Sequence, residues 1–381
     1  MRSIATIAGV FLLVVILWDG FETIILPRRV TRRVRLARLF YRSTWIPWSA
    51  VARRMKAGKR REAFLSIYGP LSLLLLFVLW AAGLIFSFAL LHWAAGSAGG
   101  SLRESTSFWT DLYMSGTTFF TLGLGDITPH TRIARFITVL ESGTGLGFLA
   151  IVISYLPVLY GAFSRREVNI SLLDARAGSP PTAAELVRRH VRGQKLETLG
   201  QFLRDWETWS AELMESHLSF PVLCYFRSQH DNQSWLSALT AVLDTCALLI
   251  SCAEGALRWQ AQLTFAISRH ALVDLAQVLQ IPPRPPASDR LSDEDLDQLR
   301  GLLASAGVPV CSTEGARQKS RDLRRMYEPY IIGFSERLLM PYPSWKPIAG
   351  PADNWKTSAW EKISSASSTA MDAEVDEEHL R

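Results

Sequence analysis

Two glycines at alternate positions suit one short segment to binding a cation through its backbone. The segment runs from Thr121 to Asp126 and reads Thr-Leu-Gly-Leu-Gly-Asp. A dehydrated cation needs oxygen atoms in place of its water shell, and successive backbone carbonyls of an extended loop can supply them. Turning those carbonyls to one side requires backbone angles that a Cβ atom disfavours, so glycine is expected at every second residue. The candidate ligands are the carbonyls of Thr121, Leu122, Gly123, Leu124 and Gly125, and the Asp126 carboxylate can attract cations and anchor the loop.

Apolar segments on both sides of this loop are long enough to cross a bilayer. Tyr68–Trp93 contains no Asp, Glu, Lys or Arg, and about 20 apolar residues span the hydrocarbon. Ile133–Phe163 forms a similar segment after the loop. Phe108–Phe119 has the length of a re-entrant helix, which is tolerated at membrane depth when protein surrounds it. Ala94–Ser107, rich in Gly, Ser and Ala, is expected to be an exposed loop.

The order of these elements resembles the pore module of tetrameric potassium channels, which consists of an outer helix, a pore helix, a selectivity filter and an inner helix. The family's filter motif is Thr-x-x-Thr-x-Gly-aromatic-Gly-Asp, and Thr118 and Thr121 coincide with its threonines. Gly123, Gly125 and Asp126 coincide with its glycines and its acid. The resemblance implies a homotetramer around a filter that binds permeant K⁺, with no other metal and no cofactor.

Three positions depart from the family pattern. Leu124 stands where the family usually has Tyr or Phe, and Phe120 replaces a smaller residue or Thr behind the filter. Thr117 replaces a carboxylate that some members place behind the filter, so the pore helix must be supported from elsewhere. Only the carbonyl of residue 124 would meet the ion, so potassium selectivity can survive; a filter loosened there would give a weakly selective cation channel.

Glu141 is a carboxyl group inside the second apolar segment, where an ionisable side chain by default indicates function or a specific partner. We hypothesise that it forms a hydrogen bond behind the filter, with Thr117 or Ser115 as partner. The alternative is a carboxyl group near the outer interface that is solvated and idle. Together with Thr117 and Thr118, Glu141 is our candidate for supporting the pore helix.

Gly143, Gly145 and Gly147 cluster in the middle of the inner helix, and Pro157 follows near its inner end. Glycine inside a helix costs about 1 kcal/mol relative to alanine, so such a cluster indicates a bending point or close packing. Packing of small residues between helices in lipid is equally compatible with the pattern. As a hinge, these residues would serve gating.

The N-terminal region predicts the orientation. Ile4–Leu26 is a further apolar segment, interrupted by Asp19 and Glu22, and thirteen Lys and Arg residues follow between positions 28 and 61. A loop this basic is expected in the cytoplasm, which puts the N-terminus and the filter mouth outside and the C-terminal region inside. A cleaved signal peptide is the alternative, but no small-x-small cleavage site follows the apolar run. This loop also accounts for the net charge of +6, so the basic balance indicates a membrane surface and not nucleic acid.

Arginines recur at every third residue in this loop, as they do in voltage-sensing helices. One upstream helix cannot form a sensor domain, however, so we expect an amphipathic helix on the anionic inner leaflet. The basic residues that would face the lipid headgroups are Arg29, Arg32, Arg35 and Arg38.

After residue 164 the sequence has the character of a soluble helical domain. Its cysteines form no CxxC pair, its histidines lack ligand spacing, and no nucleophile, base and orienting group converge, so we predict neither a metal site nor an enzyme. The predicted helices are Ala183–Arg192, Leu196–His217, Trp235–Ser251, Ala253–Leu279, Asp293–Ala306 and Glu314–Met340.

The sequence therefore predicts an all-α membrane protein with a tetrameric potassium-channel-like pore module. We expect a potassium-selective channel of the cytoplasmic membrane, with a weakly selective cation channel or a non-conducting membrane-anchored helical adaptor as alternatives. The expected parts are an N-terminal transmembrane helix at 1–27, a basic cytoplasmic linker at 28–66, the pore domain at 67–164, a helical cytoplasmic domain at 165–360 and a disordered acidic tail at 361–381.

Overall fold

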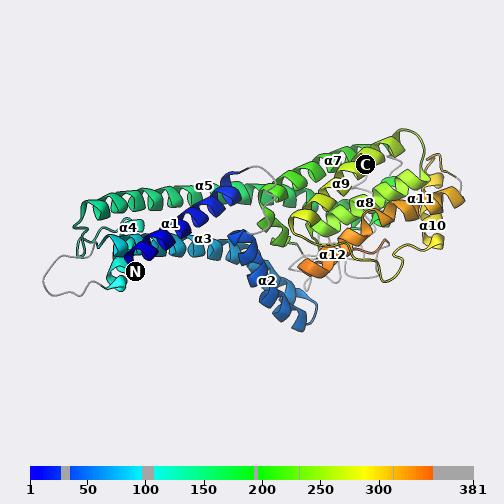
Figure 1. Ribbon diagram of the computed structural model, residues 1–381. Coiled ribbons are helices and arrows are strands. Elements are labelled where there is room, and N and C mark those ends of the chain that lie inside the picture. Colours follow the sequence, from blue (N-terminus) through cyan, green and yellow to red (C-terminus); the bar gives the residue numbers. More distant parts are fainter. Residues whose placement is uncertain (27–34, 97–106, 193–195, 231, 312, 346–381) are drawn as a thin grey trace, which may run out of the picture. The chain divides into compact units, whose positions relative to one another are not determined.

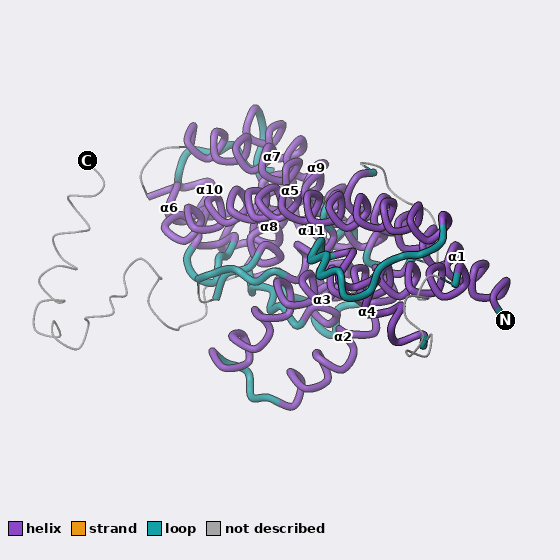
Figure 2. Tube along the Cα trace, turned by 90° about the vertical axis from the view of Figure 1, so that its left-hand side faces the viewer, coloured by secondary structure: helices purple, strands orange, loops and turns teal. Residues whose placement is uncertain are grey.

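The computed structural model describes residues 1–26, 35–96, 107–192, 196–230, 232–311 and 313–345. Within these ranges the regular elements are helices, and the β-structure is limited to an isolated antiparallel bridge between Ala253 and Val310 (Figure 2). The chain divides into two compact units, Met1–Ala162 and Phe163–Arg381. The predicted tail at 361–381 and most of the loop at 94–107 lie outside the described residues.

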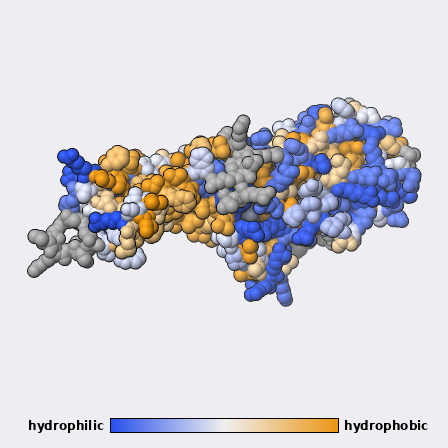
Figure 3. All heavy atoms as spheres, in the orientation of Figure 1, coloured by the Kyte–Doolittle hydropathy of each residue, from blue (hydrophilic) through white to orange (hydrophobic). Residues whose placement is uncertain are grey.

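The first unit presents an apolar surface. Side chains such as Phe11, Val78 and Val139 are largely exposed in the single chain. In Figure 3 the surface of this unit is mostly orange, the colour of hydrophobic residues. Three of its helices are long and apolar enough to cross a membrane, so the protein is an all-α membrane protein. The elements are α1 (Arg2–Gly20), the π-helical turn η1 (Phe21–Ile25), α2 (Leu36–Arg54), α3 (Lys59–Ala95), α4 (Phe108–Phe119) and the first part of α5 (Arg132–Ala177). The five α-helices are labelled in Figure 1.

Small residues allow α1 to lie close against α3. A Cβ atom on Gly9 would lie 3.0 Å from the backbone oxygen of Ser87, and the Ser87 hydroxyl donates to the Gly9 backbone oxygen at 2.6 Å. A Cβ atom on Gly83 would lie 2.5 Å from the side chain of Ile16. Such contacts are how helices gain packing energy in lipid, where burial of apolar surface gives little.

The two acids that interrupt the first apolar segment connect α1 to the start of α2. Asp19 is buried, and its Oδ2 accepts hydrogen bonds from the backbone N–H of Ala37 at 3.0 Å and from Trp80 Nε1 at 3.1 Å. It thereby satisfies one of the N–H groups that the first turn of α2 leaves unpaired. Glu22 Oε2 lies 3.6 Å from Arg35 Nε.

The amphipathic helix expected around Arg29–Arg38 overlaps α2 only from Leu36 onward, and the expectation for Arg35 needs correction. Arg35 does not face lipid headgroups, because it lies against Glu22 with its side chain only 14% exposed; the carboxylate offers a fixed partner at close range. Arg38 lies on α2 and is half-buried, whereas Arg29 and Arg32 lie outside the described residues. Aromatic stacking holds α2 on α3: the rings of Trp48 and Phe64 lie 4.4 Å apart.

The second unit is an all-helical bundle built around α8. Each residue of α8 is buried, although this helix is also long and apolar enough to cross a membrane. Burial by helices of its own unit accounts for that apolarity. The other elements are the end of α5, α6 (Ala183–Arg192), α7 (Leu196–Ser219), the 3₁₀ turn η2 (Pro221–Tyr225), α8 (Trp235–Cys252), α9 (Ala256–Val278), α10 (Asp293–Ser305), α11 (Thr313–Arg325) and α12 (Glu328–Leu338).

Most predicted helices of this unit agree with the structure to within a few residues, and two predictions need correction. The expected helix Glu314–Met340 is two helices, α11 and α12. Pro329 lacks an N–H and its ring would clash with the carbonyl of residue 325, so it is accepted only in the first turn of a new helix. The second apolar segment, expected at Ile133–Phe163, is part of a longer helix, since α5 continues to Ala177.

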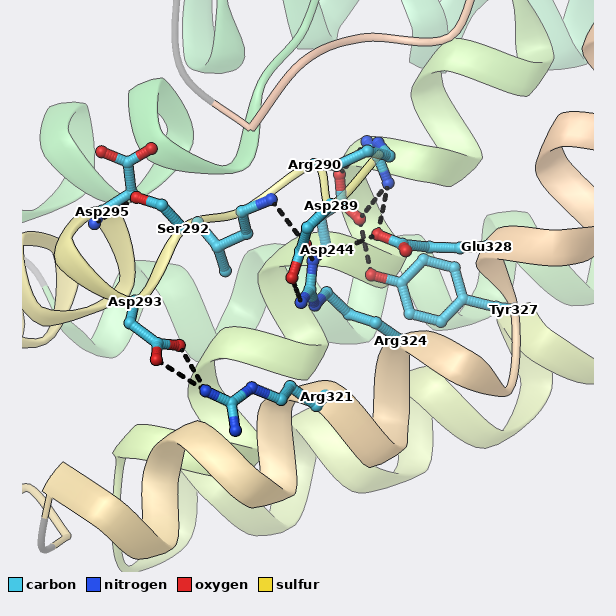
Figure 4. A network of polar contacts seen from close by, with 11 residues as sticks. Asp244, Asp289, Arg290, Ser292, Asp293, Asp295, Arg321, Arg324, Tyr327 and Glu328 are labelled. Atoms are coloured by element: carbon cyan, nitrogen blue, oxygen red, sulfur yellow. Dashed lines mark hydrogen bonds and ion pairs between the residues drawn. The ribbon is translucent and has the colours of Figure 1, made fainter. Parts of the chain in front are cut away.

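A buried polar network holds the C-terminal helices of this unit on α8 (Figure 4). Asp244 of α8 accepts from Arg290 Nη2 at 2.8 Å and from the Tyr327 hydroxyl at 2.6 Å. Arg290 Nη1 also donates to Glu328 Oε1 at 3.0 Å. At the edge of the network, a hydrogen bond from Arg324 lowers the pKa of Asp289, whereas burial raises the pKa of Glu328. Each buried charge therefore has a partner, as its desolvation requires.

Arg166 is buried where α5 enters the second unit. Its guanidinium donates to the backbone oxygens of Leu223 and Phe226, both at 3.0 Å, and its Nη1 lies 3.1 Å from His217 Nε2. A guanidinium can only donate. His217 Nε2 must therefore accept, so the imidazole of His217 is neutral.

Substitution of Gly145 by alanine is expected to destabilise the first unit. The added Cβ atom would lie 2.0 Å from the backbone oxygen of Phe119 at the end of α4. A backbone atom cannot give way as a side chain can, so we expect a loss of about 3 kcal/mol or more in the free energy of unfolding in detergent. Gly143→Ala and Gly147→Ala are matched controls, since nothing lies within 4 Å of their added Cβ atoms; their stability should be unchanged or higher by up to about 1 kcal/mol. Equal effects at all three positions would contradict this packing.

The buried imidazole of His217 is expected to make the protein less stable in acid. Burial, and then the charge of Arg166, lower the pKa of His217 well below its usual 6.5. The unfolded chain gains a proton near that pH which the native chain cannot bind, so stability present above it is lost as the pH falls. Denaturant unfolding between about pH 7 and about pH 5, followed by tryptophan fluorescence, should show a steeper loss for wild type than for His217→Gln, by up to about 1.4 kcal/mol per pH unit. The pKa of His190 is lowered too, but its effect is common to both proteins. Equal slopes would refute the prediction.

Candidate functional site

The predicted filter segment lies between α4 and α5, and backbone carbonyls of α4 hold its first residues. The backbone N–H of Thr121 donates to the Thr118 oxygen at 3.0 Å, and that of Leu122 donates to the Thr117 oxygen at 2.8 Å. Thr117 and Thr118 thus contact the segment through their main chain, while the Thr117 hydroxyl donates to the Met114 oxygen at 2.9 Å.

Positive φ angles occur at every second residue of this segment. The values are 57° at Thr121, 55° at Gly123 and 79° at Gly125. Glycine adopts such angles without steric cost. For a β-branched residue they are an outlier, so Thr121 is held there by its surroundings at a cost of about 1–3 kcal/mol. This alternation is the backbone geometry that the glycine spacing predicted.

Apolar side chains of the segment point away from the rest of the single chain. Leu122 is 61% exposed, Leu124 64% and Phe120 60%. Leucine and phenylalanine in such numbers on a loop require lipid or further protein around them.

Tyr113 lies close to the last residue of the segment, and sequence reasoning missed this contact. Its hydroxyl lies close to the carboxylate of Asp126. Tyr113 lies on α4, so this helix is close to the end of the segment as well as to its beginning. The sequence signal for this contact was weak, since Tyr113 is one of several aromatic residues in Phe108–Phe119.

Glu141 is fully buried between three helices. Its Oε1 is in hydrogen-bond contact with the hydroxyl of Ser115 on α4, one of the two partners that we predicted; the other, Thr117, bonds elsewhere. Its Oε2 lies 3.0 Å from Nε2 of His92 on α3. Sequence reasoning missed His92 because it lies in the segment Tyr68–Trp93, which was treated as a membrane span without charged residues. A histidine within such a span was the signal that could have identified it.

The glycine cluster of the inner helix lies in an uninterrupted helix. Gly145 fits against Phe119, whereas Gly143 and Gly147 have open space beside them. Pro157 lies inside α5 without ending it. Close packing therefore explains Gly145 in this structure, and a gating hinge at these positions stays a prediction.

A search for clusters of three or more His, Cys, Asp or Glu side chains that could hold a metal finds none among the described residues. Cys224, Cys246, Cys252 and Cys311 are free thiols. The glycine-rich segment between α4 and α5 is thus the strongest candidate site in the part of the chain that the structure describes.

Comparison with known proteins agrees with this geometry. Residues 73–159, which run from α3 through the glycine-rich segment into α5, match the family of ion channels. The chain is also similar to the uncharacterized membrane protein YdjJ of Bacillus subtilis (strain 168), with 26% identity over 256 residues. The alignment covers 66% of this chain and 72% of YdjJ. No solved structure matches the chain. The part of the chain that comprises α3, α4 and the first part of α5 is therefore similar to an ion channel domain.

Proposed function

We propose that the protein is a potassium-selective channel that conducts passively across the cytoplasmic membrane, with the backbone carbonyls of Thr121–Gly125 as its filter. The observation that carries the proposal is the positive φ at Thr121, Gly123 and Gly125. Such an alternation directs successive carbonyls to one side, where they can replace the hydration shell of an ion. No cofactor is needed, because passive conduction requires only this ion pathway.

A homotetramer follows from the proposal. Each chain supplies one filter segment, and a ring of carbonyls around an ion takes four of them. The inner helix offers surface for such an assembly: Ile133, Phe136, Val139, Leu146 and Ile153 are each more than half exposed in the single chain. Cyclic symmetry would bring these faces and the exposed leucines of the filter together.

A weakly selective cation channel is the second candidate, and Leu124 is the observation that favours it. The side chain is 64% exposed. Leucine has neither the hydroxyl of tyrosine nor an aromatic ring for stacking, so it cannot stabilise the filter by those contacts. A non-conducting helical adaptor would share the fold, but the strain held at Thr121 would then have no use.

The proposed membrane orientation places α2 on the anionic inner leaflet, with the N-terminus outside and the second unit in the cytoplasm. Leu39 and Ile46 of α2 are exposed, and so are Arg42, Arg53 and Arg54. Apolar and basic side chains exposed together on one helix suit the boundary between acyl chains and anionic headgroups.

Ion flux into liposomes is the test of this function. Purified protein should pass K⁺ and give a reversal potential close to the potassium equilibrium potential in opposed K⁺ and Na⁺ gradients, because the carbonyl ring favours K⁺. A reversal potential near zero would favour the weakly selective channel. Absence of flux for every monovalent cation would favour the adaptor.

Substitution of Gly123 by alanine is expected to abolish potassium preference. Gly123 has a φ of 55° and open space beside it, so the cost of a Cβ atom is one of backbone angle, about 1–2 kcal/mol in each chain. Gly116→Ala is the matched control, since Gly116 also has open space but lies inside α4. The measurement is the reversal potential in the same gradients. Unchanged selectivity in Gly123→Ala would show that the backbone angle of Gly123 does not determine the preference for K⁺.

A further inference from the structure

Ser115, His92 and Glu141 form a buried cluster behind the filter segment. The cluster makes three hydrogen-bond contacts, but Ser115 and His92 together can donate only two hydrogens to them. The Ser115 hydroxyl lies 2.7 Å from the Ile85 backbone oxygen and also contacts Glu141 Oε1. His92 Nε2 lies 3.0 Å from Glu141 Oε2. A hydroxyl has one hydrogen, an imidazole nitrogen has at most one, and a backbone oxygen has none. Three contacts need three hydrogens, and Ser115 and His92 provide two.

We infer that Glu141 carries the third hydrogen, as a neutral carboxylic acid, and that this cluster is a proton-binding site. The acid donates from Oε1 to the Ser115 hydroxyl, which donates in turn to the Ile85 backbone oxygen. Oε2 then accepts from His92 Nε2. All three contacts are satisfied in this arrangement, and the cluster carries no charge.

The surroundings of Glu141 agree with a neutral acid. His92, Ser115 and Glu141 are each 0% exposed, and a carboxylate in such a place must be paired or become neutral. The titratable group in contact with it is His92 on α3, and Asp111 is a further acid, buried one turn before Ser115 on α4. Among the described residues, no lysine or arginine forms an ion pair with Glu141.

The tautomer of His92 is consistent with the same count. Its Nδ1 is buried and has no hydrogen-bond partner among the described residues. A neutral imidazole with its hydrogen on Nε2 leaves only a lone pair there. A protonated imidazole would leave a charged N–H buried and unpaired, which costs more.

Loss of the proton would loosen the pore helix. Glu141 Oε1 would then only accept, so the single hydrogen of Ser115 could serve either Glu141 or Ile85 but not both. Ser115 lies on the helix whose end holds the filter segment, so the effect on conduction rests on the function proposed above. We expect potassium flux to fall about tenfold at alkaline pH, the factor that corresponds to about 1.4 kcal/mol for one lost buried hydrogen bond.

Infrared spectroscopy tests the protonation without depending on conduction. Full-length protein in lipid should show, at neutral pH, the C=O stretch of a protonated carboxyl group that is absent from Glu141→Gln. Asp111→Asn is the matched control, because it identifies any band of the acid that is buried one turn before Ser115 on α4. A difference spectrum that contains only carboxylate bands would overturn the inference.

Flux measured against pH, with the same pH on both sides of the liposome, tests the consequence. Glutamine can donate from its nitrogen to Ser115 and accept from His92 as the acid does, so the flux of Glu141→Gln should not fall at alkaline pH. Ser115→Ala should lower flux at every pH, whereas Ser87→Ala, which removes a buried hydroxyl from the other face of α3, should keep the wild-type profile. An identical pH profile in wild type and Glu141→Gln would refute the inference. If wild type conducts no K⁺, the proposed function fails, and the infrared band still decides whether Glu141 holds a proton.

Discussion

Backbone that leaves helical geometry within hydrocarbon must find every hydrogen-bond partner inside the protein, and this constraint organises the first unit. The filter segment leaves α4 at Phe120, and its first N–H groups return to the carbonyls of Thr117 and Thr118. Such an arrangement needs neighbouring helices packed closely around it. α5 can pack against the backbone of Phe119 because Gly145 has no Cβ atom at the point of contact.

The same constraint explains the polar residues of the apolar helices. Each of those described above has a partner: Ser87 bonds the backbone of α1, Asp19 bonds the start of α2, and Glu141 bonds groups on two other helices. In a membrane such groups are costly, so they mark contacts that the fold needs. They also determine which helices are neighbours, since apolar surfaces alone discriminate poorly between partners in lipid.

The second unit also contains a long apolar helix, but in this unit the helix is covered by protein. Its central helix α8 is as apolar as a membrane span, yet it is wholly covered by protein. Asp244 in this helix is tolerated because Arg290 and Tyr327 lie against it. Arg166 and His217 play a comparable part at the entry of α5, where a permanent charge is surrounded by acceptors.

The sequence by itself determined the order of the helices, the apolar spans and the position of the glycine-rich segment, because these depend on local composition and on glycine spacing. It also indicated that Glu141 needs a partner, and Ser115 was one of two proposed. Only the tertiary structure decided that His92 is another, that Tyr113 lies close to Asp126, that Arg35 faces Glu22 and that Gly145 serves packing. These contacts join residues far apart in the chain, and a residue's type does not reveal which distant group will lie beside it. The break between α11 and α12 could have been predicted, since Pro329 is a local signal that a long helical pattern concealed.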